Sequence, residues 1–367
     1  MNAFKIALCF VFIMLAGWWA SVLPAHAQND DSVFTVSNVH VEVEAADANT
    51  AKSKALQQAR QEAFQILIKR LVAQSNAEQI KKLSAQPAQK WVQAVELRNE
   101  RTTASKYSAD VTVIFKSSMV ETFLEGQDIS YTTASSAPFL VIPVYNRGDQ
   151  WLLLQEDSLW LSVWRKIQDT KSYGLVPIKV PLPSVKLQAS DIAPEPNRDY
   201  LLQLAAQHGL AQALLVKASL DVSNTAAGTV TRVKMIAENI SPTMQSTPVE
   251  LEYEAPPNTN LMEVFNTAAH NLLSAIEEGW KEKSAANLGD VKTVDVMVRV
   301  PDIGNYINLW QRLQSMSEVR KIHLRAMTRD VAQLSLDVSD NGDLIELFRR
   351  YNFALTQGAQ IWLLQPL

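Results

Sequence analysis

The residues best placed to do chemistry lie at a junction inside the segment FLVIPVYNRGDQWLLL, residues 139–154. Asn146, Arg147, Gly148 and Asp149 stand there between two apolar runs, where a phosphate-binding loop is the chemistry to consider first. Such a loop needs several glycines and a helix start behind it, whereas this segment has one glycine followed by strand formers. Arg147-Gly148-Asp149 also spells a tripeptide that animal integrins recognise, but a match of three residues arises readily by chance. We therefore predict a hairpin turn.

The other chemistry-bearing residues stand singly. No histidine pair has metal-site spacing, no G-x-S-x-G segment offers a nucleophile, and Cys9 is the only cysteine. Residues 339–343 (SDNGD) lack the spaced ligands and closing Glu of a calcium loop, so they predict a turn and a helix cap. The sequence thus predicts no catalytic, cofactor-binding or metal-binding residue and no cofactor. Beyond residue 27, the isolated histidines are His40, His208, His270 and His323.

Two alternatives stay open. Carboxylates that meet only in the folded chain cannot be found by spacing, so an enzyme with an acidic site in the cleft between the first two domains remains an alternative. The other is a small-molecule binding protein that uses Trp151, Trp160 or Trp164. Trp160, Val163, Trp164 and Ile167 share one helical face, however, and such a stripe is typical of core packing.

The start of the chain has the three parts of a secretory signal. Lys5 gives a positive start, residues 6–23 are uncharged and almost wholly apolar, and residues 25–27 (AHA) form an A-x-A cleavage site. We predict a signal peptide over residues 1–27 and a periplasmic protein that begins at Gln28. The alternative is a retained anchor and a membrane-associated protein, because an apolar run of 18 residues reaches the lower limit for crossing a bilayer. Peripheral membrane contact also stays open.

Composition restricts the partners and the number of domains. The 34 Lys and Arg residues are outnumbered by 38 Asp and Glu residues, and no basic stripe is present. A mildly acidic chain of this kind lacks the electrostatic footprint of a nucleic-acid binder. At about 150 residues per domain, 367 residues predict two or three domains.

Changes in hydrophobic period divide the chain into three small α/β sandwich domains, so the fold class is α+β. The first domain, residues 28–131, opens with a strand of alternating valines that has a bulge near residues 37–38. A helix with alanines four residues apart follows, capped by Asp47 or Asn49, and its small side chains let it lie close to a sheet. Two strands joined by a turn at residues 102–106 complete this domain.

The second domain, residues 138–256, begins after a polar linker and combines helices with strands. A capped amphipathic helix, residues 257–289, then leaves it as a linking helix. The predicted elements of the second domain are strands at 139–145, 174–178, 212–222, 229–237 and 248–254, and helices at 157–170 and 198–208.

The third domain, residues 290–367, has the cleanest alternation in the chain. Its predicted order is βαββαβ, the ferredoxin-like split βαβ motif, with a single last strand at 353–365. Two helices are expected to cover one apolar face of the sheet. The predicted core is Val294, Val296, Val298, Ile307, Trp310, Leu313, Ile322, Leu324, Leu334, Leu336, Val338, Leu344, Leu347 and Phe348.

The chain resembles a family of exported proteobacterial proteins classified as domain of unknown function number two thousand and sixty-six. The resemblance rests on VSNVHVEVEAADANTAKSKALQQARQEAFQILIKRL, ERTTASKYSADVTVIF, PFLVIPVY and WLSVWRKI with GLVPIKVPL. It implies export. The first domain is also similar in architecture to the small domain of the flagellar assembly protein T, and the FLVIPV domain to those of the TolB amino-terminal half and CsgG. This second similarity implies an envelope scaffold.

These observations together predict a periplasmic scaffold or assembly factor of the bacterial cell envelope. It is expected to act through protein–protein contacts with other envelope proteins rather than as an enzyme, and to bind no nucleic acid.

Overall fold

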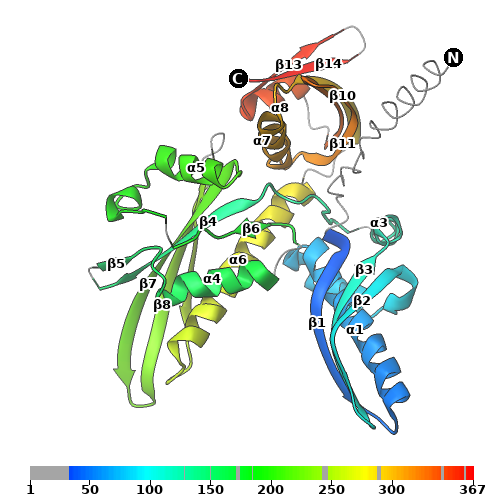
Figure 1. Ribbon diagram of the computed structural model, residues 1–367, viewed down its shortest axis with the longest axis vertical. Coiled ribbons are helices and arrows are strands. Elements are labelled where there is room, and N and C mark those ends of the chain that lie inside the picture. Colours follow the sequence, from blue (N-terminus) through cyan, green and yellow to red (C-terminus); the bar gives the residue numbers. More distant parts are fainter. Residues whose placement is uncertain are drawn as a thin grey trace, which may run out of the picture.

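The computed structural model describes residues 33–127, 129–148, 150–170, 174–183, 185–241, 247–286, 291–339, 343–358 and 361–367. Over these residues the fold is mixed α+β, with three β-sheets that each pack their own hydrophobic core (Figure 1). We call the three parts the first, second and third units. None of the described helices combines the length and apolar character needed to span a bilayer. The predicted signal peptide and its cleavage site lie outside the described residues.

The first unit is a three-stranded antiparallel sheet with a long helix against one face. Its elements are β1 (Thr35–Glu44), α1 (Ala48–Leu71), α2 (Ala77–Ser84), β2 (Val92–Thr102), β3 (Lys106–Phe115) and α3 (Ser117–Glu125). The sheet order is β1-β3-β2, and the alanine line of α1 is fully buried. The predicted cap and bulge are confirmed, since Asp47 accepts a hydrogen bond from Thr50 N at 2.9 Å and the β1 register shifts between Val36 and Val39. The short helices α2 and α3 were not predicted.

The second unit has a mixed sheet of order β5-β4-β7-β8-β9, with β6 beside β4. Strands β4 and β7 are parallel, while β7, β8 and β9 are antiparallel neighbours. Its elements are β4 (Phe139–Arg147), β5 (Gln150–Leu152), α4 (Leu159–Thr170), β6 (Ile178–Lys179), α5 (Arg198–Gln207), β7 (Gln212–Thr225), β8 (Gly228–Ile240), β9 (Val249–Glu254) and α6 (Leu261–Ala286). The helix expected only to link domains, α6, is part of this core through Val264, Phe265 and Leu272.

The third unit has a five-stranded sheet of order β11-β12-β10-β14-β13. Its elements are β10 (Val291–Arg299), α7 (Ile303–Gln314), β11 (Val319–Met327), β12 (Val331–Ser339), α8 (Leu344–Arg350), β13 (Phe353–Gln357) and β14 (Trp362–Pro366). The single last strand expected at 353–365 is instead the hairpin β13–β14, and β14 runs parallel to β10. Gly358 N donates to Ile361 O at 3.1 Å, and a Cβ at position 358 would lie 2.4 Å from that oxygen, so this reversal requires glycine.

Four residues predicted to be in the core of the third unit are not fully buried. Ile307 is 45% exposed and Trp310 is half-buried, because α7 turns Leu309 and Leu313 toward the sheet instead. Leu324 is 44% exposed, since the register of β11 shifts directly after it and the strand leaves the core. Leu344 lies partly buried at the edge of the cluster, and the other predicted core residues are buried.

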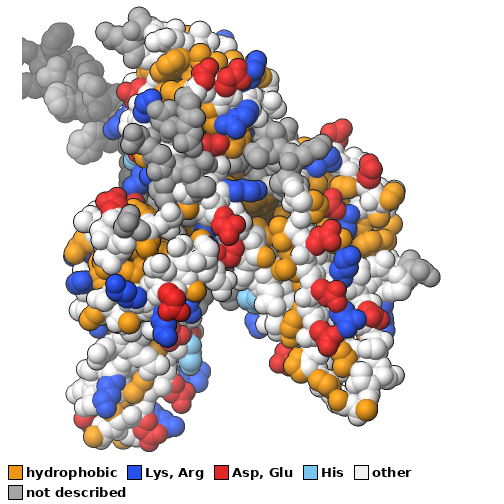
Figure 2. Space-filling model, turned by 180° about the vertical axis from the view of Figure 1, so that it is seen from behind, with side chains coloured by type: hydrophobic (Ala, Val, Ile, Leu, Met, Phe, Trp, Pro, Cys, Tyr) orange, Lys and Arg blue, Asp and Glu red, His pale blue; other side chains and the backbone are white. Residues whose placement is uncertain are grey.

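The first and third sheets have helices against one face and a polar surface on the other, which we call the open face. In the second sheet, β4 and the first half of β7 are buried on both faces, so its open face is limited to β8, β9 and the second half of β7. The buried and the open face differ because side chains along a strand point alternately to the two faces of the sheet, so every second side chain points away from the helices. Both signs of charge are interspersed over the view in Figure 2, in which the first and second units separate as two lobes below the third. Cross-strand pairs on the open faces include His40 with Asp110, Arg232 with Glu254, and Thr293 with Asp337.

Candidate functional site

The three units meet around the C-terminal half of α6, a region we call the junction (Figure 1). Lys281 is 3% exposed, and its Nζ donates to Lys69 O at 2.9 Å and Val72 O at 3.1 Å. These carbonyls end α1 and have no partner within that helix, so a buried cation there acts as a cap supplied by another helix. Glu278 pairs with Lys281 and also accepts from Gln74 N at 2.8 Å. We call this arrangement the Lys281–Glu278 clamp.

Trp280, beside the clamp, joins the first two cores. Its side chain packs against both hydrophobic clusters, and its Nε1 donates to Ala134 O at 2.7 Å. On the other side of α1, Arg70 donates to Val33 O at 2.6 Å and Thr35 O at 2.8 Å. Burial lowers the pKa of Arg70 to about 10, and the Glu277 carboxylate on α6 opposes that shift. The end of α1 is therefore held by polar groups on both sides.

The third unit contacts each of the other two through charged or amide side chains. Lys321 Nζ lies 3.1 Å from Glu121 Oε1 on α3 of the first unit. On the second unit, Gln311 accepts from Ala211 N at 2.9 Å and donates to Gly209 O at 2.8 Å. Gln311 lies on α7, so the same helix that covers the sheet of the third unit also contacts the second unit, whereas Lys321 reaches the first unit from β11.

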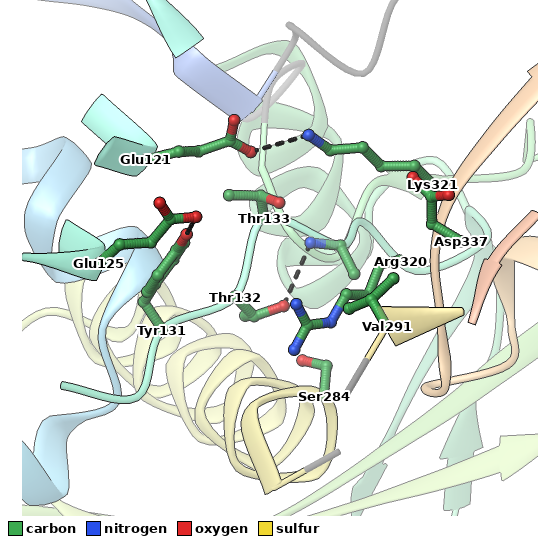
Figure 3. Close-up of a pocket in the computed structure, with 11 residues that line it drawn as sticks. Glu121, Glu125, Tyr131, Thr132, Thr133, Ser284, Val291, Arg320, Lys321 and Asp337 are labelled. Carbon is green, nitrogen blue, oxygen red and sulfur yellow. Dashed lines mark hydrogen bonds and ion pairs between the residues drawn. The ribbon is translucent and has the colours of Figure 1, made fainter. Parts of the chain in front are cut away.

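A pocket of about 200 Å³ lies between the first and third units at the end of α6 (Figure 3). Its walls contain carboxylates from α3 and β12 and cations from β11. Hydroxyl groups from the segment that follows α3 and from α6 also line it. Its lining residues are Glu121, Glu125, Tyr131, Thr132, Thr133, Ala134, Ser284, Val291, Arg320, Lys321 and Asp337. We call it the junction pocket.

Arg320 is the group in this pocket whose hydrogen bonding is incomplete. Its Nη2 is buried and has no hydrogen-bond partner among the described residues. Burial lowers the pKa of Arg320, while Tyr131, Asp337 and Glu125 oppose that shift. Burial also raises the pKa of Tyr131, and so does the Glu125 carboxylate, which accepts the Tyr131 hydroxyl at 3.3 Å. The phenol therefore stays neutral at ordinary pH and acts as a donor to Glu125.

Asp337 is already hydrogen-bonded on its outer side. Thr293 Oγ1 donates to Asp337 Oδ1 at 2.8 Å, and His323 Nε2 lies 3.7 Å from Asp337 Oδ2. The pocket thus brings together three carboxylates and two cations, but no Ser, Cys or Lys nucleophile activated by an adjacent base. Such a mixture of fixed charges can hold a polar molecule or join two units electrostatically.

Three carboxylates thus meet between the first and third units. The acidic site between the first two domains, one alternative drawn from the sequence, stays a prediction. Among the described residues, no group of three or more His, Cys, Asp or Glu side chains could hold a metal ion. Sequence reasoning missed this pocket because its lining residues come from six separate segments, and none of those segments carries a recognisable motif.

The other residues considered in the sequence fall as follows. Arg147 and Gly148 form the predicted hairpin turn between β4 and β5, with φ of +70° at Gly148. Trp160 and Trp164 are fully buried in the second core, so they cannot line a ligand site there. Asp343 caps α8 by accepting from Ile345 N at 2.9 Å, whereas residues 340–342 and Asp149 lie outside the described residues.

Each of the four histidines among the described residues has a partner of its own. Two of them, His208 and His270, are hydrogen-bonded through Nδ1 to carbonyls one helical turn earlier, and His40 and His323 pair with aspartates. A scan against protein-family models matches no family, and a search of curated proteins gives no similar sequence.

Proposed function

We propose that this protein is a scaffold or assembly factor of the bacterial cell envelope, exported to the periplasm, which acts through protein–protein contacts. One observation carries the proposal: three sheets that expose polar faces are joined by polar contacts, from α6 to the first unit through Lys281 and from the third unit to the other two through Lys321 and Gln311. Rigidly spaced sheet faces suit recognition of protein surfaces, because a preformed surface loses little conformational entropy on binding. The resemblance to exported envelope proteins is consistent with this role.

The third unit is part of the proposal. We propose that it is a variant of the ferredoxin-like split βαβ motif in which a hairpin replaces the last strand. Its first strand, β10, is central, and β11 and β12 lie on one side of it, as that motif requires. The hairpin places β14 between β10 and β13, so the edge strand on that side of the sheet is β13, with only five residues. A short edge strand discourages uncontrolled pairing and favours recognition by side chains.

The export part of the proposal is tested by the amino terminus of the protein in fractionated cells. Mass spectrometry of the periplasmic fraction should find Gln28 as the first residue. Recovery of the intact chain in the membrane fraction would contradict the cleavage and indicate a retained anchor.

The scaffold part is tested by photo-crosslinking in living cells. A photoreactive residue at His40, Arg232 or Thr293 samples one open face each, and at least one should capture a discrete envelope protein. Substitution of the buried Phe265 by the same photoreactive residue serves as the control, because a buried group cannot reach a partner. Products that involve only abundant proteins, in equal amounts from every position, would refute a scaffold acting through these faces.

A further inference from the structure

We propose that the free edge of β9 in the second sheet binds an extended partner segment in which apolar residues alternate with lysine or arginine. This inference rests on the scaffold role, because it names the chemical class of segment that the second unit recognises. Strand β9 is the last in the sheet order and pairs with β8 alone among the described strands. Such an edge presents a row of unpaired backbone groups, which is a template for the addition of a strand.

The backbone groups that face outward can be assigned from the ladder. Ala255, directly after β9, donates from its N–H to Thr231 O on β8 at 2.9 Å, so every second residue before it also directs its N–H and C=O groups at β8. The residues between them, Glu250, Glu252 and Glu254, therefore direct theirs at the free edge. The register of β8 with β9 has no bulge and β9 has no proline, so the strand lacks two features that commonly block pairing at an edge.

The apolar side of β9 is incompletely covered. Val249, Leu251 and Tyr253 are half-buried against the second core. Their neighbours on β8, among them Val233 and Met235, are fully buried, because a central strand has a strand on each side and an edge strand has only one. Apolar residues at every second position of an added strand would cover the surface that remains, which is why we expect alternation in the partner.

The opposite side of β9 selects the charge of the partner. Glu250, Glu252 and Glu254 are all exposed, the last two by 57% and 55% of their side chains. Glu252 and Glu254 share Arg232, whereas Glu250 lies opposite Ile236 and forms no ion pair with a described cation. A second copy of the chain, paired antiparallel at this edge, would set glutamate opposite glutamate, which is unfavourable, while lysine or arginine there is favourable. The edge is therefore protected against its own copies and open to a basic strand.

Antiparallel pairing determines which residues of the partner supply the hydrogen bonds. A residue directly opposite Glu252 lies on the same face as Glu252 and exchanges both backbone hydrogen bonds with it. The basic residues of the partner therefore bond to β9, while its apolar residues direct their N–H and C=O groups away from β9. This division is specific to strand addition, because attraction between charges alone would not distinguish one backbone amide from another.

The test is calorimetric titration of the purified chain with a peptide of alternating lysine and valine. Methyl groups on the lysine amides should weaken binding by at least about tenfold, because they remove the hydrogen bonds to β9. Methyl groups on the valine amides should leave the affinity unchanged, and a peptide with its lysines and valines in two separate blocks should bind at least about tenfold more weakly. No heat with the alternating peptide at millimolar concentration would overturn the proposal, as would equal binding of the two methylated forms.

A pair of variants locates the site. Glu250→Lys should weaken binding of the lysine–valine peptide by about fivefold and favour the corresponding glutamate–valine peptide. Glu156→Lys is the matched control and should bind as the parent does, because this exposed residue follows β5 at the opposite edge of the same sheet. The thermal midpoint of each variant reports folding separately.

Equal losses in the two variants would show that binding follows net charge and would refute the assignment to β9, as would unchanged binding in a folded Glu250→Lys protein. These titrations use the purified chain, whereas photo-crosslinking in cells tests the scaffold role. A failure of the β9 assignment is therefore distinguishable from a failure of the scaffold proposal.

Discussion

The Lys281–Glu278 clamp gives the sharpest prediction for the stability of the junction. Lys281→Met keeps the aliphatic stem and removes the ammonium, so two carbonyls at the end of α1 and the Glu278 carboxylate lose their donor. Loss of one partner of a buried ion pair costs about 3–5 kcal/mol. Glu278 remains 27% exposed and keeps its hydrogen bond from Gln74 N, so we expect about 3 kcal/mol, the lower end of that range.

Hydrogen exchange is the appropriate assay, because a chain with three cores does not unfold as one two-state unit. A loss of about 3 kcal/mol corresponds to an increase on the order of 100-fold in the opening equilibrium of the junction. The Gln74 amide, which donates to Glu278, should lose protection by that factor in the Lys281→Met protein. Amides in β10 and β12, which belong to a separate core, should keep theirs.

The control is Lys283→Met, two residues away on the same helix with an exposed side chain. This variant should exchange as the parent does, because exposed lysines without buried partners contribute little. If Gln74 protection were the same in the Lys281→Met and Lys283→Met proteins, the clamp would contribute nothing measurable. The first and second units would then be held by Trp280 and apolar packing alone.

Three further outcomes follow from the structure. Leu313→Ala should lower the free energy of unfolding of the third unit by about 2–5 kcal/mol, because Leu313 is buried against the sheet. Ile307→Ala, on the exposed face of α7, should change it by no more than about 0.5 kcal/mol. Denaturant titration measures both, and equal effects would contradict the orientation of α7. Burial, and then the Glu100 carboxylate, raise the pKa of Tyr107 to about 12. The unfolded chain therefore ionises first, and stability should fall as pH rises from about 10 to about 12, a slope that Tyr107→Phe should reduce. Arg147→Ala, in a solvated turn, should leave the thermal midpoint unchanged; a clear shift would mean that the turn is structural.

Much of the local structure could be predicted, because apolar residues recur with a different period in strands and in helices. The alternation of Val39, Val41 and Val43 gave β1, and the alanines four residues apart gave the buried face of α1. The last strand failed because Gly358 was read as interior to a strand, although a glycine in such a run often marks a reversal. In α7, Ile307 and Leu309 are both apolar, and only tertiary packing decides which of them faces the sheet.

The junction could not be predicted, because it depends on how separate units are placed. Lys281 and Glu278 belong to a stretch rich in lysine and glutamate, and such a stretch usually faces water. Their partners at residues 69–74 lie about two hundred positions earlier in the chain, and Lys69, whose carbonyl accepts from Lys281, is 212 positions away. The feature of the sequence that could have indicated the junction is Trp280, a large aromatic residue among the charged residues of the last turns of α6.

The length of α6 has an evolutionary consequence. This helix has 26 residues, so it is roughly 39 Å long, with the second core at its start and the junction at its end. One inserted residue between Leu273 and Trp280 would advance the distal half by about 1.5 Å and rotate it by about 100°. Lys281 and Trp280 would then face away from the first unit while Phe265 stayed in place. Insertions and deletions should therefore be absent from this half-helix in descendants of the sequence, even where loop lengths drift freely.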